Sequence, residues 1–599
     1  MEKRGHSVTP STSLVPDGDA TTLFTSAGMQ PMMPYLLGQK HPQGTRVVNS
    51  QKCFRSQDID EVGDNRHTTF FEMLGNWSLG DYFKDKQLEW FFAFLVNKEE
   101  GLGLDPKRIF VSVFEGGSGV AKDIEAINIW QSLFAKMGIA TQEGDHIFAY
   151  PAEKNWWSRA GIPEKMPNGE PGGPDSEVFF DFGEEQKIHE KSPYSKEKCH
   201  PNCDCGRYME IGNNVFMQYV KKEDGGLGDL PKKNIDFGGG LTRLEAAVNN
   251  DPDMFKISSL YPLIQEIEKI TGKSYADEIN QSPMRVIADH VTAATFLIKD
   301  GVFPSNKAQG YVLRRLLRRA AIKLYYLIGS RENLDALSSL SVKVIEFYSP
   351  LYFDKKNDPP AIQGEIKIEI GRFSKSLDKG IKELQKTSHI DGKTAFDLYQ
   401  NYGFPLEITT EILSQMNLKI DTKEFEAEFE KHKKLSRSAS SGMFKGGLAD
   451  NSKVVTAYHT TTHLLHASLR QVLGDHVSQK GSNITAERLR FDFSHPDKLT
   501  EKEIQSIENI INQIISEKLP VSRKEMPKDA AIKEGAMAFF GQKYPDIVSV
   551  YTVGDEGNVF SKEICGGPHV TNTKELANIK VVKQESLGAM TRRLYLQFV

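Results

Sequence analysis

The spacing of apolar residues changes along the chain, and these changes divide it into regions of different secondary structure. In residues 1–250, short apolar runs bounded by turn residues are typical of β-strands. The expected strands include TTLFTSAGM (21–29), RIFVSVFEG (108–116), SEVFFDFG (176–183) and NNVFMQYV (213–220). Because several such runs follow one another without a helical stretch between them, we expect an antiparallel sheet. Segments 87–98 and 123–138 have helical spacing, so this region is predicted to be a mixed α and β domain.

The remainder of the chain has two further patterns. From residue 251 the apolar residues recur every three or four positions, which predicts a helical domain over 251–435. Residues 436–453 are rich in Ser, Gly and Lys and are predicted to be a linker. Residues 454–599 begin with a helical pattern and continue with strand-like runs, which predicts a separate α+β domain. The expected fold class is therefore a multidomain α+β protein.

Composition excludes several classes of protein. Of the 599 residues, 39% are hydrophobic and 26% are charged, a balance typical of globular proteins and not of disordered or collagen-like chains. No run of about 18 apolar residues occurs, so no membrane-spanning helix is expected. A net charge of −5 argues against a polycation that coats nucleic acid. Five cysteines are too few for a disulfide scaffold, and we expect a cytoplasmic protein with reduced thiols.

Four histidine and cysteine residues in the last region have the spacing of metal ligands. His459 and His463 are four residues apart in a helical pattern and therefore lie on one side of the helix. Cys565 and His569 are also four apart, in a Gly-Gly-Pro loop. An HxxxH pattern alone occurs by chance, but together with a Cys–His pair it supplies the four ligands of a tetrahedral zinc ion. We expect zinc at this group, and we expect His466, one turn further, to pack.

A cysteine cluster in the first region leaves two interpretations open. Cys199, Cys203 and Cys205 lie close together, and His189 lies ten residues before the first of them. The spacing of the three cysteines fits a second structural zinc site. Free thiols in a loop fit the same pattern equally well.

Two arginines lie where predicted strands end. Arg55 precedes an acidic loop, and its guanidinium presents a fixed fork of donors that suits a phosphate. Arg243 follows three glycines, Gly238–Gly240, which allow a backbone to approach a ligand closely. Taken separately, a surface ion pair and a tight strand-to-helix turn explain these features as well.

One predicted helix of the second region carries a basic face. The basic residues of this face follow one another at spacings of one and four positions, and no acidic residue occurs between positions 310 and 326. They are Arg314, Arg315, Arg318, Arg319 and Lys323. Such a face suits RNA phosphates. The alternative is a face that is solvated or paired with acidic side chains from other parts of the chain.

Together, the stretches around Arg55 and Arg243 resemble motifs 2 and 3 of the class II aminoacyl-tRNA synthetases, and further stretches are similar to the alanyl-tRNA synthetase family. These stretches are colinear along nearly the whole chain. They are LFTSAGM (23–29), TFFEMLGNWSLGDYF (69–83), NWW (155–157), EIGNNVFMQY (210–219), IDFGGGLTR (235–243), RVIADH (285–290), PSNKAQGYVLRR (304–315), LYQNYGFPLEIT (398–409), HTTTHLLH (459–466), HVSQKGS (476–482), RLRFDFSH (488–495) and CGGPHV (565–570). The resemblance implies an antiparallel catalytic domain in 1–250, a tRNA-recognition domain in 251–435 and a zinc editing domain in 454–599.

The resemblance also implies roles for residues of the catalytic domain. It indicates Arg55 at the ATP α-phosphate, Asp236 at the alanine ammonium and Arg243 at the γ-phosphate as the catalytic residues. It assigns ATP binding to Arg55, Thr68, Trp157, Asn213, Gly240 and Arg243. It assigns alanine binding to Asn213, Val215, Asp236 and Gly238. Magnesium is expected with ATP because the phosphates need charge neutralisation.

For the other domains the resemblance implies contacts with tRNA(Ala) and an editing pocket. Asn306 and Gln400 match the residues that read the G3:U70 wobble pair, although the family usually has Asp at the second position. Arg314, Arg315 and Arg318 of the basic face are expected to contact the same RNA. Gln479 matches a position in the editing pocket. The implied zinc ligands of that domain are His459, His463, Cys565 and His569.

The implied activity is that of an alanine–tRNA ligase with an editing hydrolase. Such an enzyme activates L-alanine with ATP to alanyl-adenylate, transfers alanine to the 3′ end of tRNA(Ala) and hydrolyses mischarged seryl- or glycyl-tRNA(Ala). The alternatives are a deacylase whose synthetase domain is inactive and a non-catalytic RNA-binding protein. The family's coiled-coil segment and C-terminal domain have no counterpart here, so we expect a short form that is a monomer.

Overall fold

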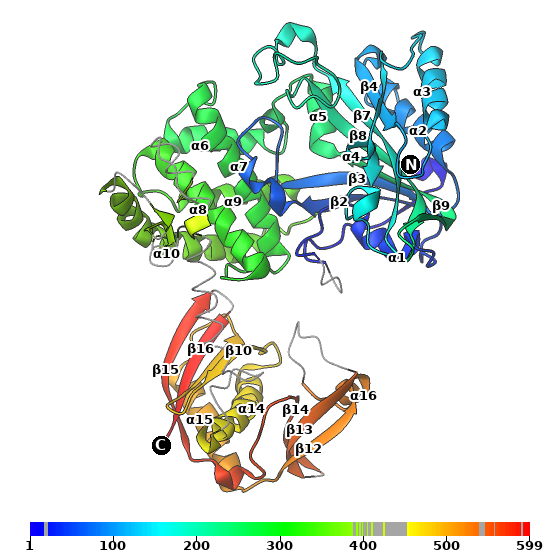
Figure 1. Cartoon of the computed structure of the whole chain (residues 1–599). Helices are drawn as coiled ribbons and strands as arrows, with labels where there is room; N and C mark the ends of the chain where they lie inside the picture. Colours follow the sequence, from blue (N-terminus) through cyan, green and yellow to red (C-terminus); the bar gives the residue numbers. More distant parts are fainter. Residues whose placement is uncertain are drawn as a thin grey trace. The chain divides into compact units, whose positions relative to one another are not determined.

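The computed structural model describes residues 1–16, 22–386, 452–537, 546–555, 557–588 and 591–599, with short pieces between 391 and 425. The chain divides into two units, Met1–Ser374 and Lys375–Val599 (Figure 1). Nearly all of the predicted linker, 436–453, lies outside the described residues. Among the described residues, no helix combines the length and the apolar character needed to cross a membrane.

A nine-stranded sheet forms the centre of the first unit (Figure 1). Its strands are β1 (Ser7–Val8), β2 (Arg46–Phe54), β3 (Phe70–Ser78), β4 (Ile109–Phe114), β5 (Ile147–Tyr150), β6 (Trp156–Trp157), β7 (Pro171–Asp181), β8 (Tyr208–Lys221) and β9 (Leu227–Gly240). They are arranged in the order β1-β2-β3-β9-β8-β7-β4-β5, and β6 pairs with β7. The predicted antiparallel sheet is confirmed for the neighbouring pairs β2–β3, β3–β9, β9–β8, β8–β7 and β7–β4. The two edge pairs, β1–β2 and β4–β5, are parallel.

Two longer helices cover one face of this sheet. The helical segments predicted in this region are confirmed as α2 (Lys84–Val96) and α3 (Ile124–Lys136), and two short helices are α1 (Met33–Leu36) and α4 (Ala152–Asn155). Gln87 of α2 donates to Oδ1 of Asn214 at 3.0 Å, and Phe91 packs on Phe237 with ring centroids 4.5 Å apart. Because neighbouring residues of a strand point to opposite faces, Asn213, Asp236 and Gly238 lie on the other face of β8 and β9.

The predicted strand at 21–29 is wrong. Its described part, from residue 22, forms bends and turns beside the end of β2, where the Thr25 amide donates to the carbonyl of Leu14. The turn brings Gly28 against the indole of Trp77, since a Cβ at Gly28 would lie 3.2 Å from the ring. A short apolar run has the same spacing whether it pairs as a strand or packs as a turn on an aromatic ring.

Helices form the remainder of the first unit, in agreement with the helical spacing that begins at residue 251, and most of 387–435 lies outside the described residues. They are α5 (Leu241–Asn249), α6 (Tyr261–Thr271), α7 (Glu278–Lys299), α8 (Ala308–Ile328), α9 (Ala336–Tyr348) and α10 (Asp358–Lys386), the last of which continues into the second unit. Figure 1 shows α6 to α9 gathered beside one end of β2 and β3. Phe296 of α7 stacks on Phe70 of β3 with ring centroids 3.9 Å apart. This contact joins the helices to the hairpin that carries Arg55.

The second unit contains two antiparallel sheets and confirms the predicted α+β region. One sheet has the order β10-β11-β16-β15, and the other has the order β12-β13-β14. The strands are β10 (Gln479–Ile484), β11 (Leu489–Ser494), β12 (Val521–Pro527), β13 (Ile547–Asp555), β14 (Asn558–Ile564), β15 (Ile579–Gly588) and β16 (Thr591–Phe598). The helices are α14 (Lys453–Leu473), α15 (Glu501–Ser516) and α16 (Lys528–Lys533). Helices α14 and α15 pack on the four-stranded sheet around a core that includes Leu465, Phe491 and Leu594.

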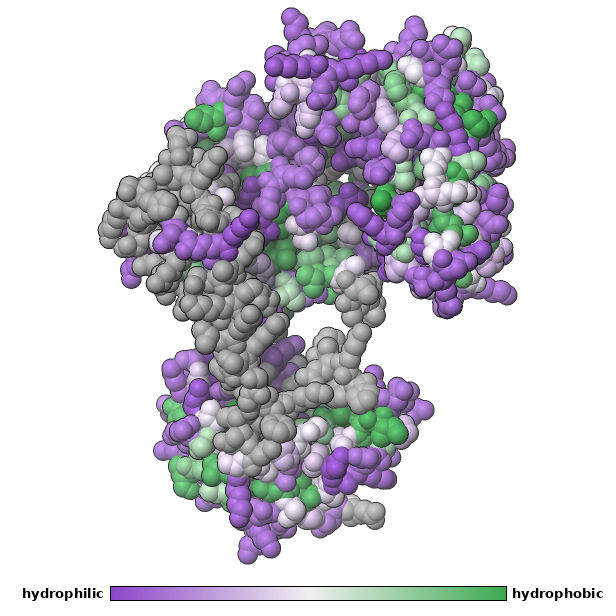
Figure 2. Space-filling view, viewed as in Figure 1, coloured by the Kyte–Doolittle hydropathy of each residue, from purple (hydrophilic) through white to green (hydrophobic). Residues whose placement is uncertain are grey.

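The drawn surface of both units is mostly hydrophilic (Figure 2). Hydrophobic residues are scattered over it among the charged ones, as on most folded proteins. The chemistry of the chain is therefore sought in its pockets and side-chain clusters.

Candidate functional site

The open face of the central sheet brings together the residues that were predicted from separate motifs. Val215 of β8 lies opposite Asp236 of β9, and Asp236 lies opposite Trp77 of β3. One step along the strands, Asn213 lies opposite Gly238. Since directly paired residues of antiparallel strands share a face, these side chains form two adjacent rows across three strands.

Asp236 is the buried polar centre of these rows. Its Oδ1 accepts a 2.7 Å hydrogen bond from Nε1 of Trp77. Burial raises the pKa of the carboxyl to about 7, and the indole hydrogen bond only partly opposes this rise. A cation bound against this carboxylate would relieve the cost of its burial.

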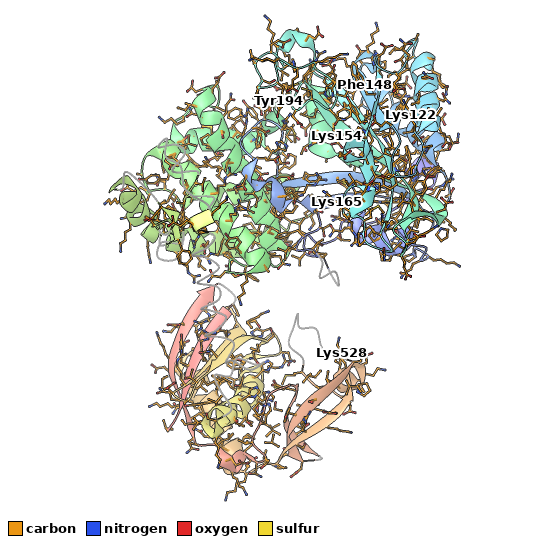
Figure 3. All side chains as sticks on the ribbon, viewed as in Figure 1. Lys122, Phe148, Lys154, Lys165, Tyr194 and Lys528 are labelled. Carbon is orange, nitrogen blue, oxygen red and sulfur yellow. The ribbon has the colours of Figure 1, made fainter. Side chains whose placement is uncertain are left out.

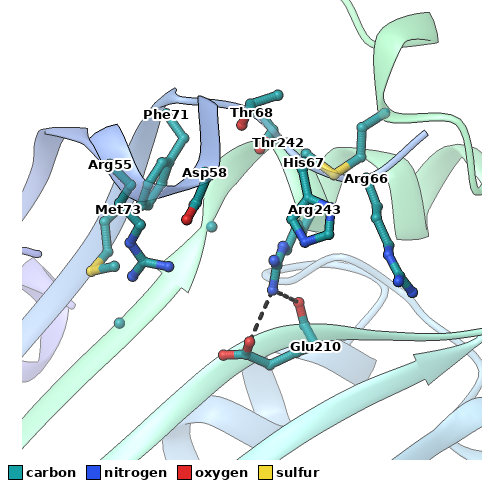
Figure 4. A pocket seen from close by; sticks show the side chains of 13 residues that line it. Arg55, Asp58, Arg66, His67, Thr68, Phe71, Met73, Glu210, Thr242 and Arg243 are labelled. Atoms are coloured by element: carbon teal, nitrogen blue, oxygen red, sulfur yellow. Dashed lines mark hydrogen bonds and ion pairs between the residues drawn. The ribbon is translucent and has the colours of Figure 1, made fainter. Parts of the chain in front are cut away.

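A pocket beside these rows collects five of the predicted residues, namely Arg55, Thr68, Gly238, Gly240 and Arg243 (Figure 4). Arg55 lies just after β2, where its Nε donates to the carbonyl of Ser26 at 3.2 Å and its guanidinium lies over the ring of Phe71. Arg243 lies in the first turn of α5, and its Nη1 donates to the carboxylate of Glu210 at 2.9 Å. Arg55 and Arg243 therefore present two guanidinium groups to a shared space that Arg66 also lines, an arrangement suited to a polyphosphate.

Glycines Gly238 and Gly240 line the pocket with backbone atoms. A Cβ at Gly238 would lie 2.9 Å from Sδ of Met73, so a side chain there would displace the Met73 side chain of the neighbouring strand. The strand therefore brings its backbone close to any ligand in the pocket, as the three consecutive glycines predicted.

Trp157, Val215 and Asn213 lie outside the lining of this pocket. Val215 is buried in an apolar cluster with Trp77, against which Trp157 is partly buried. Asn213 donates from Nδ2 to Oδ2 of Asp175 at 3.0 Å. Asn213 and Val215 adjoin Gly238 and Asp236 through the strand register, whereas Trp157 lies in β6 opposite Gly173 of β7.

The sequence analysis missed a group of carboxylates on the same face. Burial raises the pKa of Asp175 to about 7, and burial and then the nearby Glu210 raise the pKa of Glu177. Asp175 and Glu177 are two positions apart in β7, with Ser176 between them, and the strand is almost entirely buried. Two acidic residues at alternate positions of a buried strand were the signal that could have identified them.

The basic face of α8 makes ion pairs with other elements. Arg318 is buried and donates to Glu369 of α10 at 2.7 Å, and Arg314 approaches the same carboxylate at 3.3 Å. Arg315 pairs with Asp60 at 2.6 Å, in the loop that follows Arg55. These contacts match the alternative in which the basic face is paired with acidic groups from elsewhere. Asn306 is exposed just before α8, and Gln400 lies outside the described residues.

The metal-ligand pattern of the second unit forms a group in the structure. The donor atoms of His459, His463, Cys565 and His569 all lie within 4.8 Å of one another. Nε2 of His459 is 3.5 Å and Nε2 of His569 is 3.4 Å from Sγ of Cys565. The chain thus offers three imidazoles and one thiol to a single point.

Hydrogen bonds orient two of these rings. Nδ1 of His459 donates to the carbonyl of Pro568 at 2.9 Å, and Nδ1 of His569 lies 3.2 Å from Oγ1 of Thr460. Burial lowers the pKa of His459 to about 4 and lowers that of His463, so both are neutral at pH 7, as metal ligands must be. These features fit a tetrahedral zinc site in which protein groups hold the far side of the His459 and His569 rings.

Two other predicted residues of this unit lie nearby in the fold. Gln479 is buried at the start of β10, and β10 packs against α14, which carries His459 and His463. Nδ1 of His466 lies 3.1 Å from Oε1 of Glu563, and His466 is not one of the four grouped donors. The expectation that His466 packs without joining the group is therefore consistent with its position.

The other predicted cysteine cluster also assembles. Donor atoms of His189, Cys199, Cys203 and Cys205 lie within 4.8 Å of one another. Sequence analysis noted His189 only as a neighbour, and the structure brings its ring to the three thiols. The cluster therefore has four donors, as a metal site requires.

Comparison with known proteins identifies the relatives of this chain. Residues 1–488 match the family model of tRNA synthetases class II (A), and residues 548–595 match the threonyl and alanyl tRNA synthetase second additional domain. An alanine–tRNA ligase of Treponema denticola is 44% identical over 99% of this chain and 96% of its own length. The enzyme of Borrelia hermsii is 44% identical over 99% and 97%, and that of Thermotoga petrophila is 35% identical over 99% and 78%. The chain belongs to the alanine–tRNA ligase family of the class II tRNA synthetases.

Proposed function

We propose that this protein activates L-alanine with ATP, transfers the alanine to the 3′ end of tRNA(Ala) and hydrolyses mischarged tRNA at a separate zinc site. The observation that carries the proposal is the buried Asp236 carboxylate beside a glycine floor and two arginines. Loss of tRNA(Ala) charging in Asp236→Asn, with wild-type charging as the control, tests it. The functional division that we propose is 1–250 for catalysis, 251–435 for tRNA recognition, 436–453 as linker and 454–599 for editing.

Asp236 and its neighbours account for selection of alanine. The carboxylate binds the amino acid's ammonium group, which supplies the cation that its burial requires. Val215 and Gly238 provide small apolar surfaces that fit a methyl side chain, and Asn213 completes the subsite. A larger side chain would meet the strand backbone at Gly238.

Arg55 and Arg243 account for the nucleotide. Arg55 stabilises the charge that develops as the alanine carboxylate attacks the α-phosphorus, and Arg243 holds the γ-phosphate end. Arg243 donates to Glu210 through Nη1, and its guanidinium has further N–H groups that can bind ATP. Thr68, Trp157, Asn213 and Gly240 complete the ATP site in this proposal.

Magnesium enters this proposal with ATP. The carboxylates of Asp175, Glu177 and Glu210 gather on the sheet face next to the two arginines. Carboxylate oxygens are ligands that Mg²⁺ prefers, and the ion neutralises phosphate charge when bound.

Recognition of tRNA(Ala) is assigned to the helical region. We propose that Asn306 and Gln400 read the G3:U70 pair and that Arg314 and Arg315 face the acceptor stem. Arg318 contributes to this surface by holding Glu369, since its own side chain is buried against that residue. Because Arg315 also pairs with Asp60, the RNA surface and the loop after Arg55 are joined by one ion pair.

The second unit is assigned to editing. A pocket for a methyl group discriminates only weakly against glycine and serine, at about 1–3 kcal/mol for a methylene and about a hundredfold for an added hydroxyl. We propose that His459, His463, Cys565 and His569 hold zinc and that Gln479 lines the pocket beside them. Zinc bound there would supply a Lewis acid and an ordered anchor for the mischarged tRNA end.

The deacylase with an inactive synthetase domain is not favoured. That alternative expects residues of the ATP or alanine site to be lost. The presence of Arg55, Asp236 and Arg243 around one sheet face supports the ligase over this alternative.

A further inference from the structure

The connection between β7 and β8, residues 182–207, is long and has little regular structure. Its one helical element is the short 3₁₀ turn Glu184–Gln186. From 187 to 206 its buried residues are His189, Pro201, Cys203 and Gly206. Tyr194, which Figure 3 labels, lies in this connection at the margin of the first unit. A connection of this length without an apolar core needs another source of order to offset its conformational entropy.

Two of the buried residues belong to the cluster of four donors. Nδ1 of His189 is 3.6 Å from Sγ of Cys203, and Sγ of Cys199 is 3.7 Å from Sγ of Cys205. All four donor atoms lie within 4.8 Å of one another, so a single ion could contact all of them. The four residues span the connection from its first third to its end.

The surroundings of the cluster orient its donors. Nε2 of His189 donates to the carbonyl of Glu197 at 3.0 Å, which leaves Nδ1 directed to the thiols. The backbone amide of Arg207 donates to Sγ of Cys205 at 3.4 Å. Such bonds to the far ring nitrogen and to sulfur are those that hold ligands in structural metal sites.

We propose that His189, Cys199, Cys203 and Cys205 bind a structural zinc ion that fixes the β7–β8 connection. Three thiols and an imidazole form a closed set of four ligands, which suits zinc and disfavours the oxygen-preferring Mg²⁺. Binding releases the three thiol protons, and no oxidation is involved. This site is separate from the zinc proposed for editing and does not take part in either reaction.

The connection ends against the ATP pocket. Arg207, two residues after Cys205, makes two hydrogen bonds of 2.8 Å with Asp181 at the end of β7. A Cβ at Gly206 would lie 3.3 Å from Nη1 of Arg66, and Arg66 lines the pocket (Figure 4). The metal would therefore hold one wall of the nucleotide site in place.

Zinc content of the purified full-length protein tests the proposal. Elemental analysis should give about two zinc ions per chain for the wild type and about one for Cys199→Ser or Cys203→Ser. Cys53→Ala, which removes a buried thiol far from both groups in sequence, should keep both ions. Cys565→Ser should also keep one ion, so failure of the editing site and failure of this site are distinguishable.

Two further measurements cover a variant that folds poorly. Cobalt bound to Cys565→Ser protein should show thiolate-to-metal absorption, and this absorption should disappear when Cys199 and Cys203 are also replaced by serine. Trypsin should cleave Cys203→Ser faster than wild type at Lys196 or Lys198, which are exposed in the connection. Wild-type protein with one zinc that only Cys565→Ser loses, or a Cys199–Cys205 disulfide found by mass analysis of alkylated protein, would overturn the proposal.

Discussion

Nε1 of Trp77 donates a 2.7 Å hydrogen bond to Oδ1 of Asp236, and the two residues are directly paired on β3 and β9. Gly75, the neighbour of Trp77 on the same face, lies under the indole, since a Cβ there would lie 2.3 Å from the ring carbon Cη2. The indole therefore lies flat over Gly75 of its own strand, and its N–H group holds the Asp236 carboxylate of the next strand. This arrangement sets the position of the Asp236 carboxylate between Trp77 and Val215 in the sheet.

Asp236→Asn should separate the two activities. Asparagine still accepts the hydrogen bond from Trp77, so the substitution removes charge and preserves shape. We expect kcat/KM for alanine in ATP–pyrophosphate exchange to fall about 100-fold or more, because a buried charged partner of the ammonium is lost. Hydrolysis of seryl-tRNA(Ala) should be unchanged. An equal loss of exchange and hydrolysis would contradict the separation of the sites.

Alanine binding should weaken in acid. The pKa of Asp236 is raised to about 7 by burial, so below pH 7 the carboxyl is increasingly protonated and neutral. KM for alanine should therefore rise as pH falls from 8 to 6, with about a tenth of the carboxyl ionised at the lower limit. ATP–pyrophosphate exchange at saturating ATP measures this profile. A KM that stays constant over this range while Asp236→Asn loses activity would show that the carboxyl is ionised throughout.

Cys565→Ser and Cys203→Ser form a matched pair. Each replaces one thiol of a four-donor group, but in different units of the chain. Cys565→Ser should reduce hydrolysis of seryl-tRNA(Ala) by about 10- to 100-fold and leave alanine activation intact. Cys203→Ser should leave that hydrolysis intact. Deacylation assays on both proteins make the comparison, and the reverse pattern would refute the assignment of editing to the second unit.

Glu369→Gln should destabilise the protein more than Asp60→Asn. Glu369 and Arg318 are both buried, so Glu369→Gln removes one charge of a buried ion pair, at about 3–5 kcal/mol. Asp60 is 61% exposed in its pair with Arg315, and such pairs contribute about 0–1 kcal/mol. Thermal melting of the two variants measures the difference. Equal melting temperatures would mean that Glu369 does not hold α8 against α10.

Patterns within one element could be predicted from the sequence. The four-residue spacing predicted that His459 and His463 lie on one side of a helix, and α14 carries both. His569 was predicted as a metal ligand because it lies four residues after Cys565 in the same domain as the two histidines. These predictions depend on local geometry, which the residue spacing determines.

Pairings between distant elements could not be predicted. The residue spacing predicted a basic face on α8 but could not predict its acidic partners. Glu369 lies 51 residues from Arg318, and Asp60 lies 255 residues from Arg315. His189 likewise joined three cysteines through an irregular connection, in which spacing carries no geometric information. The turn at Gly28 was predicted as a strand because its contact is with Trp77, far along the chain.

Amino-acid-dependent ATP–pyrophosphate exchange tests the central claim most directly. The full-length protein would be assayed with alanine, serine, glycine and threonine, with Asp236→Asn as the control. We predict exchange that is strongest with alanine, weaker with serine and glycine and weakest with threonine, because the β-branched side chain meets the backbone at Gly238. No exchange with any of the four, in protein that still hydrolyses seryl-tRNA(Ala), would contradict the account and identify the chain as a deacylase.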